Sequence, residues 1–420
     1  MLSGSAGTDV IIPALDPWLA HTPCNHNPLN RTGNDMPDGR NGLTIHTIRS
    51  ITDVPAPSWD ACAGLDNPFC THAFLSAMEE SGSAAPDSGW TPLHLLVENA
   101  QGRLLACAPL YVKTHSYGEY VFDWSWANAW QKAGGRYYPK LQCAIPFTPV
   151  TGVRLLIHPD HRSAGLEDML ADTMVALARK AGLSSVHVTF ATRTEAERLA
   201  GRGWLLRIGE QYHWSNQDYG DFDDFLAALS SRKRKTIRKE RERANQPGIR
   251  IHTLTGPAIE DRHWDAFYRF YLNTVEKKWG NAYLTRDFFG RLGHDMADRV
   301  VLFMAEENGR FVAGALNLLG RDTLYGRNWG SEGDYRFLHF EMCYYRAIDF
   351  AIAQGLAKVE AGAQGEHKIS RGYLPVETWS AHWIADPSLR HAVAVFLEDE
   401  RRHMAAAIEA LADSGPYRRD

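Results

Sequence analysis

An order of elements that occurs twice is the strongest constraint that this sequence places on its fold. The stretch LLVENAQGRLLACAPLYV (95–112) resembles FMAEENGRFVAGALNLLG (303–320), and both are typical of two strands joined by a polar turn. Downstream, LARKAGLSSVHVTF (177–190) resembles FAIAQGLAKVEAGA (350–363), and both are typical of a helix end, a glycine stop and a buried strand. Such pieces occur by chance in any α/β protein, but two matched pairs in one order favour a duplicated α/β unit.

The repeat divides the chain into four parts. We expect a flexible N-terminal extension at 1–43, a first α/β domain at 44–214, a second at 215–388, and a C-terminal helix and tail at 389–420. Apolar spacing in the second domain predicts one amphipathic helix over 222–245, which continues until a Pro-Gly break. The fold class expected is α/β with mixed sheets.

Composition excludes several classes of protein. The 420 residues carry a net charge of −5 and are 44% hydrophobic, which suits well-filled cores and argues against DNA binding over the whole surface. We expect no membrane span, because no long apolar run is present, and no signal peptide; Met36 is an alternative start. The cysteines form no CxxC pair or zinc spacing, which predicts reduced thiols, no metal and a cytoplasmic protein. Separately, we expect a monomer or homodimer.

A basic stretch, SSRKRKTIRKERERA (230–244), interrupts this mildly acidic chain. On a helix, Arg234, Arg238 and Arg241 share one face, and Lys235 lies beside them. A nucleic-acid arm, a solvated helix face and the wall of a site for an anionic substrate all fit the stretch. A purely solvated face usually mixes signs more evenly, so the excess of cations favours phosphate binding.

The segment RLLIHPDHRSAGLEDML (154–170) predicts a strand, a turn and the start of a helix. Backbone amides at such a helix start can bind a pyrophosphate, so Arg162 and Gly165 are candidate phosphate-binding residues. Glu167 follows closely, and its carboxylate would repel a phosphate. An ordinary strand–turn–helix explains the same pattern.

The run EAGAQGEHKISRGY (360–373) places a dense mixture of charges at the predicted end of a buried strand. Glu366 or His367 could take a proton from an attacking amine, and Lys368 and Arg371 could hold phosphate or carboxylate. Gln364 would line the same cleft. A solvated loop with scattered charges is the alternative.

Glu341 lies near the start of a predicted helix in HFEMCYYR. It either complements the helix dipole or projects into the cleft as a base. Arg327 and Trp329 follow a predicted strand and would line that cleft, although a tryptophan is more often part of a core. Nothing around Cys343 indicates a nucleophile.

An aromatic-rich insertion in the first half has no counterpart in the second half. Its candidate acceptor-binding residues are Asp123, Trp124, Trp126, Tyr138 and Lys140. Extra length with aromatic side chains suits a substrate-recognition loop, and core packing of an irregular loop fits equally well.

Taken together, these motifs resemble the FemAB-like, or peptidoglycan biosynthesis/recognition, predicted N-acyltransferases of the GCN5-related N-acetyltransferase (GNAT) superfamily. The residues at 162–167 follow the GNAT pattern Q/R-x-x-G-x-G/A except that Glu167 replaces the small residue. The resemblance extends from about 44 to 386 and rests on FDWSWANAW (122–130), YYPKLQCAIPFTPVTGVRLL (137–156), the basic stretch, GRNWG (326–330), HFEMCYYRAIDFAI (339–352) and EAGAQGEHKISRGYLPV (360–376).

The resemblance implies tandem GNAT-like domains in a Fem-type architecture, with the basic helix beside the acyl-donor site. We expect an N-acyltransferase that uses acyl-CoA as a cosubstrate, with no tightly bound cofactor, and a cell-wall precursor or small amine as acceptor. An aminoacyl-tRNA donor is the first alternative. A catalytically inactive peptidoglycan-recognition protein is the second.

Overall fold

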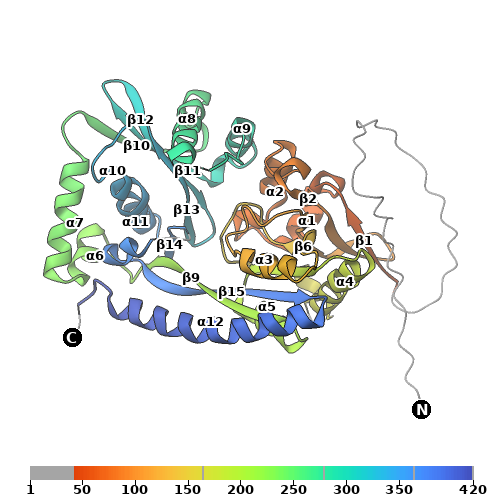
Figure 1. Ribbon diagram of the computed structural model, residues 1–420. Helices are drawn as coiled ribbons and strands as arrows, with labels where there is room; N and C mark the ends of the chain where they lie inside the picture. The colour runs from red at the N-terminus through yellow and green to blue at the C-terminus, as the bar shows by residue number, and fades with distance from the viewer. Residues whose placement is uncertain (1–41, 163–164, 278–279, 363–364, 419–420) are drawn as a thin grey trace, which may run out of the picture.

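The computed structural model describes residues 42–162, 165–277, 280–362 and 365–418, which form a mixed α/β fold with two sheets (Figure 1). The smaller sheet has the strand order β1 (Leu43–Ile48), β3 (His94–Asn99), β4 (Leu104–Ala108), β7 (Leu156–Ile157). The larger sheet has the strand order β10 (Ile249–Thr255), β11 (Val300–Glu307), β12 (Arg310–Leu319), β13 (Thr323–Ser331), β14 (Lys358–Glu360), β9 (Leu205–Ser215), β15 (Leu374–Ile384), β8 (Ser185–Ala191), β6 (Lys140–Cys143), β5 (Leu110–Lys113), β2 (Trp90–Pro92).

Helices cover these sheets along the described part of the chain. They are α1 (Ala56–Ala63), α2 (His72–Glu80), α3 (Trp124–Lys132), α4 (Leu166–Lys180), α5 (Arg193–Gly201), α6 (Phe222–Ala228), α7 (Ser231–Ala244), α8 (Asp261–Lys277), α9 (Arg286–Asp295), α10 (Leu338–Phe340), α11 (Arg346–Ala353) and α12 (Pro387–Asp413). The predicted α/β class with a C-terminal helix is confirmed. None of the helices in the described ranges is both long enough and apolar enough to cross a membrane.

The element order predicted from the repeat is present twice. The antiparallel pair β3–β4 is followed by α4 and β8, and the antiparallel pair β11–β12 is followed by α11 and β14. In each copy a glycine with positive φ, Gly182 or Gly355, follows the helix. Glycine adopts this left-handed conformation without steric cost, so the chain can turn from the helix into the strand.

Two long strands connect the copies. β9 ends where the sequence predicts the boundary between domains, and it pairs with β14 of the second copy and with β15. β15 lies between β9 and β8, so each copy is completed by a strand from the other part of the chain. Figure 1 shows α12 running along both long strands, and the three elements pack together. The eleven-stranded sheet is therefore continuous across both copies.

A shared hydrophobic core also joins the copies. Helices α1 and α2 pack with α8 and α9 in one buried cluster. Within it Phe74 and Phe288 meet edge to face at 5.9 Å, and Phe69 meets Tyr325 at 5.2 Å. Such aromatic pairs bury large apolar area and restrict geometry, which fixes how the two copies sit against each other.

The single helix predicted over 222–245 is wrong, because the structure divides it into α6 and α7. Leu229 has an extended backbone with ψ 157° and forms a β-bridge with Tyr417. Ser230 donates its backbone N–H to Pro416 O, and its carbonyl accepts from Arg234 N in the first turn of α7. Pairing with the C-terminal segment thus competes with the helix at this point. Most of the predicted N-terminal extension, residues 1–41, lies outside the described residues.

Candidate functional site

A cavity of ≈ 520 Å³ opens where β13 and β14 separate. These parallel strands pair only from Thr323 with Lys358 to Tyr325 with Glu360, and beyond that point β13 continues along β12 alone within the described residues. The lining residues come from both halves of the chain: Tyr120, Pro149, Tyr271, Thr274, Val275, Tyr283, Ala315, Leu316, Asn317, Gly326, Arg327, Asn328, Trp329, His339, Cys343, Tyr344, Ala361, Gly362, Gly365, His367 and Lys368. Ligands in α/β folds bind at such a strand exit.

His367 presents its imidazole at this cavity from the 3₁₀ segment η8 (Glu366–Arg371). Its Nε2 lies 2.9 Å from the hydroxyl of Tyr344, in the π-helical turn η7 (Glu341–Tyr345). Partial burial, followed by the nearby charges of Arg371 and Lys368, lowers the pKa of His367 from its ordinary 6.5. The imidazole is therefore neutral at pH 7 and able to accept a proton.

Two neighbours fix the segment that carries His367. Gly365 has φ 112°, and a Cβ there would lie 2.4 Å from His367 Cε1, so only glycine leaves room for the ring. Lys368 is 3% exposed and donates from Nζ to Gly362 O at 2.9 Å. Burial lowers the pKa of Lys368 to about 8, so this cation is present at pH 7 and is lost in mildly alkaline solution.

The opposite wall of the cavity comes from β13. Arg327 donates from Nη2 to Phe147 O at 2.7 Å, and the Trp329 ring lies 5.3 Å from the ring of His339. Cys343 also lines the cavity, but burial raises the pKa of its thiol far above the ordinary value. A thiol is nucleophilic only as the thiolate, so Cys343 is not an activated nucleophile.

The two predicted catalytic carboxylates, Glu366 and Glu341, lie outside the cavity lining. Glu366 is exposed on η8 and is not part of the cavity lining. Glu341 is completely buried, with Oε1 at 3.2 Å from Arg241 Nη2 and 3.0 Å from Arg346 Nε. These ion pairs hold the π-helical turn against α7, so Glu341 has a structural role here. The predicted residue Gln364 lies outside the described residues.

The basic helix α7 packs against η7 and η8 but turns most of its cations away from the cavity. Lys235 and Arg238 are exposed, and Arg234 is half-buried. Arg238 pairs with Asp223 at 2.9 Å on the surface. Lys235 and Arg238 thus form an exposed basic surface on α7, with the half-buried Arg234 on the same helix, and none of the three belongs to the cavity lining.

The predicted pyrophosphate loop of the first half precedes α4. Gly165, with φ 68°, occupies the N-cap position, and Arg162 ends a 3₁₀ turn just before residues that the structure does not describe. Glu167 and Asp168 occupy the first helical turn, where both pair with Arg198. These carboxylates already complement the helix dipole at this end.

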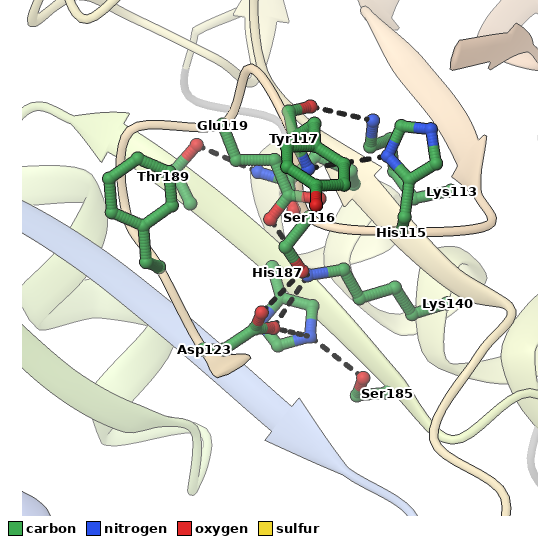
Figure 2. A network of polar contacts seen from close by, with 12 residues as sticks. Lys113, His115, Ser116, Tyr117, Glu119, Asp123, Lys140, Ser185, His187 and Thr189 are labelled. Atoms are coloured by element: carbon green, nitrogen blue, oxygen red, sulfur yellow. Dashed lines mark hydrogen bonds and ion pairs between the residues drawn. The ribbon is translucent and has the colours of Figure 1, made fainter. Parts of the chain in front are cut away.

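The aromatic insertion contains a buried network of charges (Figure 2). Lys140 Nζ lies 2.5 Å from Asp123 Oδ2 and 2.7 Å from Glu119 Oε2, and its side chain is fully buried. Burial alone would raise the pKa of Asp123, but Lys140 and His187 bring that pKa well below its ordinary value. Burial raises the pKa of Glu119 to about 7 against the attraction of Lys140. Asp123 and Lys140 therefore fix the loop and do not line the cavity.

The other predicted residues of the insertion surround this network. Tyr138 Oη lies 2.8 Å from the Ser116 hydroxyl. Trp126 is buried and meets His382 edge to face at 5.1 Å. Trp124 is 42% exposed and stacks on Phe122 at 4.4 Å. None of these three side chains belongs to the cavity lining.

Sequence reasoning missed the residues that the first half contributes to the cavity. Tyr120 lies between Glu119 and Asp123, the two acids that contact Lys140. Its hydroxyl oxygen is 2.6 Å from the hydroxyl oxygen of Tyr283. Tyr283 in turn stacks on Phe147 at 4.2 Å with an interplanar angle of 7°. The aromatic density of the insertion was a signal for ligand contact, but it did not identify Tyr120. Among the described residues, no group of three or more His, Cys, Asp or Glu side chains could hold a metal ion.

Structures with a similar fold include the crystal structure of FemX, at 12% identity and TM-score 0.48, covering 75% of this chain and 93% of that one. They also include a tandem GNAT protein from the clavulanic acid biosynthesis pathway (12% identity, TM-score 0.44, 82% and 99% covered). L-PGS from Bacillus licheniformis is a third (11% identity, TM-score 0.46, 77% and 95% covered). A search of curated protein sequences finds no match to this chain.

The family model described as FemAB-like, peptidoglycan biosynthesis/recognition, matches residues 50–419. This range contains the repeated α/β units, both long connecting strands, the cavity and α12. The match thus extends over nearly the whole described chain, and the protein belongs to the FemAB-like family.

Proposed function

We propose that the protein is an N-acyltransferase that moves an acyl group from acyl-CoA to an amine of a cell-wall precursor, in the cavity between β13 and β14. The observation that carries the proposal is a neutral imidazole, His367, at a cavity where two parallel strands separate. Membership of a family described by peptidoglycan biosynthesis or recognition supports the choice of acceptor. We place the reaction in the cytoplasm, where acyl-CoA is made.

The chemistry requires one proton acceptor and no covalent enzyme intermediate. The acceptor amine loses a proton to His367, directly or through water, and its nitrogen attacks the thioester carbonyl carbon. The C–N bond forms, the C–S bond breaks, and the CoA thiolate takes the proton that the amine nitrogen lost, from His367 or through water, which returns the imidazole to its neutral form. The edge of β13 beyond Tyr325 has no β14 partner in the described residues, so its backbone is suited to polarise the carbonyl.

Lys368 supports the binding of a charged donor at this site. Its ammonium group lies in the cavity wall beside Gly362, within the same segment as His367. A cation that is largely protonated at pH 7 can pair with a phosphate of the donor. Since burial has lowered its pKa, an anionic ligand would also restore part of the lost solvation.

A second donor, aminoacyl-tRNA, is favoured by the exposed cations of α7. Lys235 and Arg238 lie on the outside of a helix that packs against the His367 segment. A tRNA is large enough to contact this surface while its acceptor end enters the cavity, whereas one CoA molecule carries few phosphates. Binding of tRNA through several phosphates would weaken steeply as salt concentration rises.

The test compares both donors with the same acceptor. Purified protein is incubated with acetyl-CoA and a muropeptide that carries a free lysine amine, and release of the CoA thiol and acetylated product is measured. A parallel reaction uses aminoacyl-tRNA. Transfer from acetyl-CoA that depends on His367 supports the proposal, and transfer only from tRNA supports the second donor. Muropeptide binding without transfer from either donor contradicts both and favours a recognition protein.

A further inference from the structure

The cavity is lined by cations but by no carboxylate among the described residues. Arg327 and Lys368 are its charged lining residues, alongside the histidines 339 and 367. A partly open site whose lining carries positive charge and no carboxylate attracts an anionic group, because buried charges are costly until they are paired. The excess of positive charge in the cavity lining therefore indicates that the ligand carries an anionic group.

Arg327 is the cation with more hydrogen-bond donors to offer a ligand. One of its nitrogens donates to Phe147 O, and its guanidinium lies 5.4 Å from the Phe69 ring centroid. No described Asp or Glu lies within ion-pair distance of its guanidinium, and Glu360 acts on its charge from farther away. Burial lowers the pKa of Arg327 from its ordinary value, which reflects the cost of holding this charge away from water. A planar guanidinium has five donors, so most of them remain for a ligand.

Two tyrosines complete the surroundings of Arg327. Tyr120 and Tyr283 line the same cavity as Arg327, and their hydroxyl oxygens lie 2.6 Å apart. One tyrosine comes from the first half of the chain and the other from the second. One of the two O–H protons bridges the pair, so the other remains as a neutral donor beside the guanidinium and can bind a second oxygen of the same anion.

We propose that Arg327, Tyr120 and Tyr283 form an oxyanion-binding subsite of the cavity, which takes either a carboxylate of the acceptor or a phosphate of the donor. This subsite rests on the proposed function only in naming the acceptor and the donor as sources of the anionic group. A bidentate contact from Arg327 would orient the bound molecule as well as hold it.

The test measures binding by calorimetry with defined probes, using the full chain. The probes are acetyl-CoA, the tripeptide L-Lys-D-Ala-D-Ala, and the same tripeptide as its C-terminal amide. Arg327→Met should weaken binding of the relevant probe at least about tenfold, as expected for loss of a charged hydrogen bond. The affinity of Arg327→Lys for that probe should lie between those of the wild type and Arg327→Met, because lysine keeps the charge but cannot bind in a bidentate manner. Arg321→Met is the matched control, since that side chain is 77% exposed and outside the cavity lining.

The two sources of the oxyanion give different patterns. Weaker binding of the tripeptide acid alone, to the level of its amide, assigns the subsite to an acceptor carboxylate. Weaker binding of acetyl-CoA assigns it to a donor phosphate. If Arg327→Met does not fold, Arg327→Lys and the Tyr120→Phe, Tyr283→Phe double variant provide the same comparison.

Unchanged binding of both probes by the variants, or no binding of either probe by the wild type, overturns the subsite. Turnover is not part of this readout. A protein that binds a probe through Arg327 but transfers no acetyl group retains the subsite and loses the proposed function, so the two failures are distinguishable.

Discussion

Arg371 of η8 donates two hydrogen bonds of 2.9 Å to the carboxylate of Glu240 on α7, and both side chains are almost completely buried. The guanidinium also lies 3.5 Å from the ring centroid of Phe340. This pair joins the basic helix to the segment that carries His367. Arg371, which the sequence offered as a phosphate-binding residue, is thus engaged in holding the two elements together.

Breaking this pair should destabilise the protein strongly. Arg371→Met leaves the Glu240 carboxylate buried without its partner, and we expect a loss of about 3–5 kcal/mol in the free energy of unfolding. Urea denaturation monitored by circular dichroism measures the change. Arg238→Met removes an exposed pair on the same helix, with side chains 59% and 76% exposed, and should cost less than about 1 kcal/mol. Similar losses in the two variants would contradict the structural role of Arg371.

The Lys140 network should control the loop that carries Tyr120. Lys140→Met leaves Glu119 and Asp123 buried without the cation that contacts both, and we expect a loss of about 3–5 kcal/mol in the free energy of unfolding. Because these contacts flank Tyr120, the loop 114–123 should also become sensitive to chymotrypsin. Mass spectrometry of the fragments locates the cuts. The prediction is contradicted if Lys140→Met unfolds at the same urea concentration as wild type and its loop still resists chymotrypsin.

The pH dependence of transfer follows from His367 and Lys368. The pKa of His367 lies below 6.5, so its base form predominates at neutral pH and is lost as pH falls below that value. Lys368 has a pKa of about 8, so its charge is lost as pH rises through about 8. We therefore expect kcat/KM with acetyl-CoA to fall on the acid side below pH 6.5 and on the alkaline side from about pH 8. In Lys368→Met the alkaline limb should disappear while the acid limb stays; an unaltered alkaline limb excludes Lys368.

Tyr344 should position His367 through its hydroxyl. Tyr344→Phe removes the 2.9 Å contact with Nε2 but leaves the ring, so the imidazole loses the partner that fixes its orientation. We expect kcat to fall about tenfold, the order expected for one hydrogen bond, with the acceptor KM little changed. Steady-state kinetics separate the two constants. A change in KM alone would place Tyr344 in acceptor binding instead.

Local sequence patterns predicted the repeated order of elements because hairpins, helix ends and buried strands leave short-range signals. They could not predict that β15 inserts between β8 and β9, since pairing between strands so distant in sequence leaves no local pattern. The break at Leu229 was missed for the same reason. It depends on a bridge to Tyr417, almost two hundred positions away in the printed sequence.

In the candidate site, too, local sequence patterns predicted some residues, and contacts between distant residues decided the others. His367 and Lys368 follow β14 as expected, whereas Arg327 and Trp329 lie within β13 and not after it, because that strand continues along β12; the structure still brings all four to one cavity. Glu341 has a similar context, but its partner Arg241 is a hundred positions away, and their ion pair turns the carboxylate from the cavity. Charge type alone does not distinguish a buried ion pair from a catalytic group. Whether a carboxylate is structural or catalytic depends on its ion-pair partner, which is known only from the fold.

Transfer kinetics of His367→Ala test the central claim most directly. With acetyl-CoA and the lysine-containing muropeptide, we expect kcat/KM to fall by about a hundredfold to ten-thousandfold, the usual effect of losing a general base. Acetyl-CoA affinity, measured by calorimetry, should stay within about twofold. His294→Ala, whose side chain is 90% exposed and outside the cavity lining, should transfer like wild type. If His367→Ala transfers acetyl groups as fast as wild type, His367 is not the base and the proposed site is refuted.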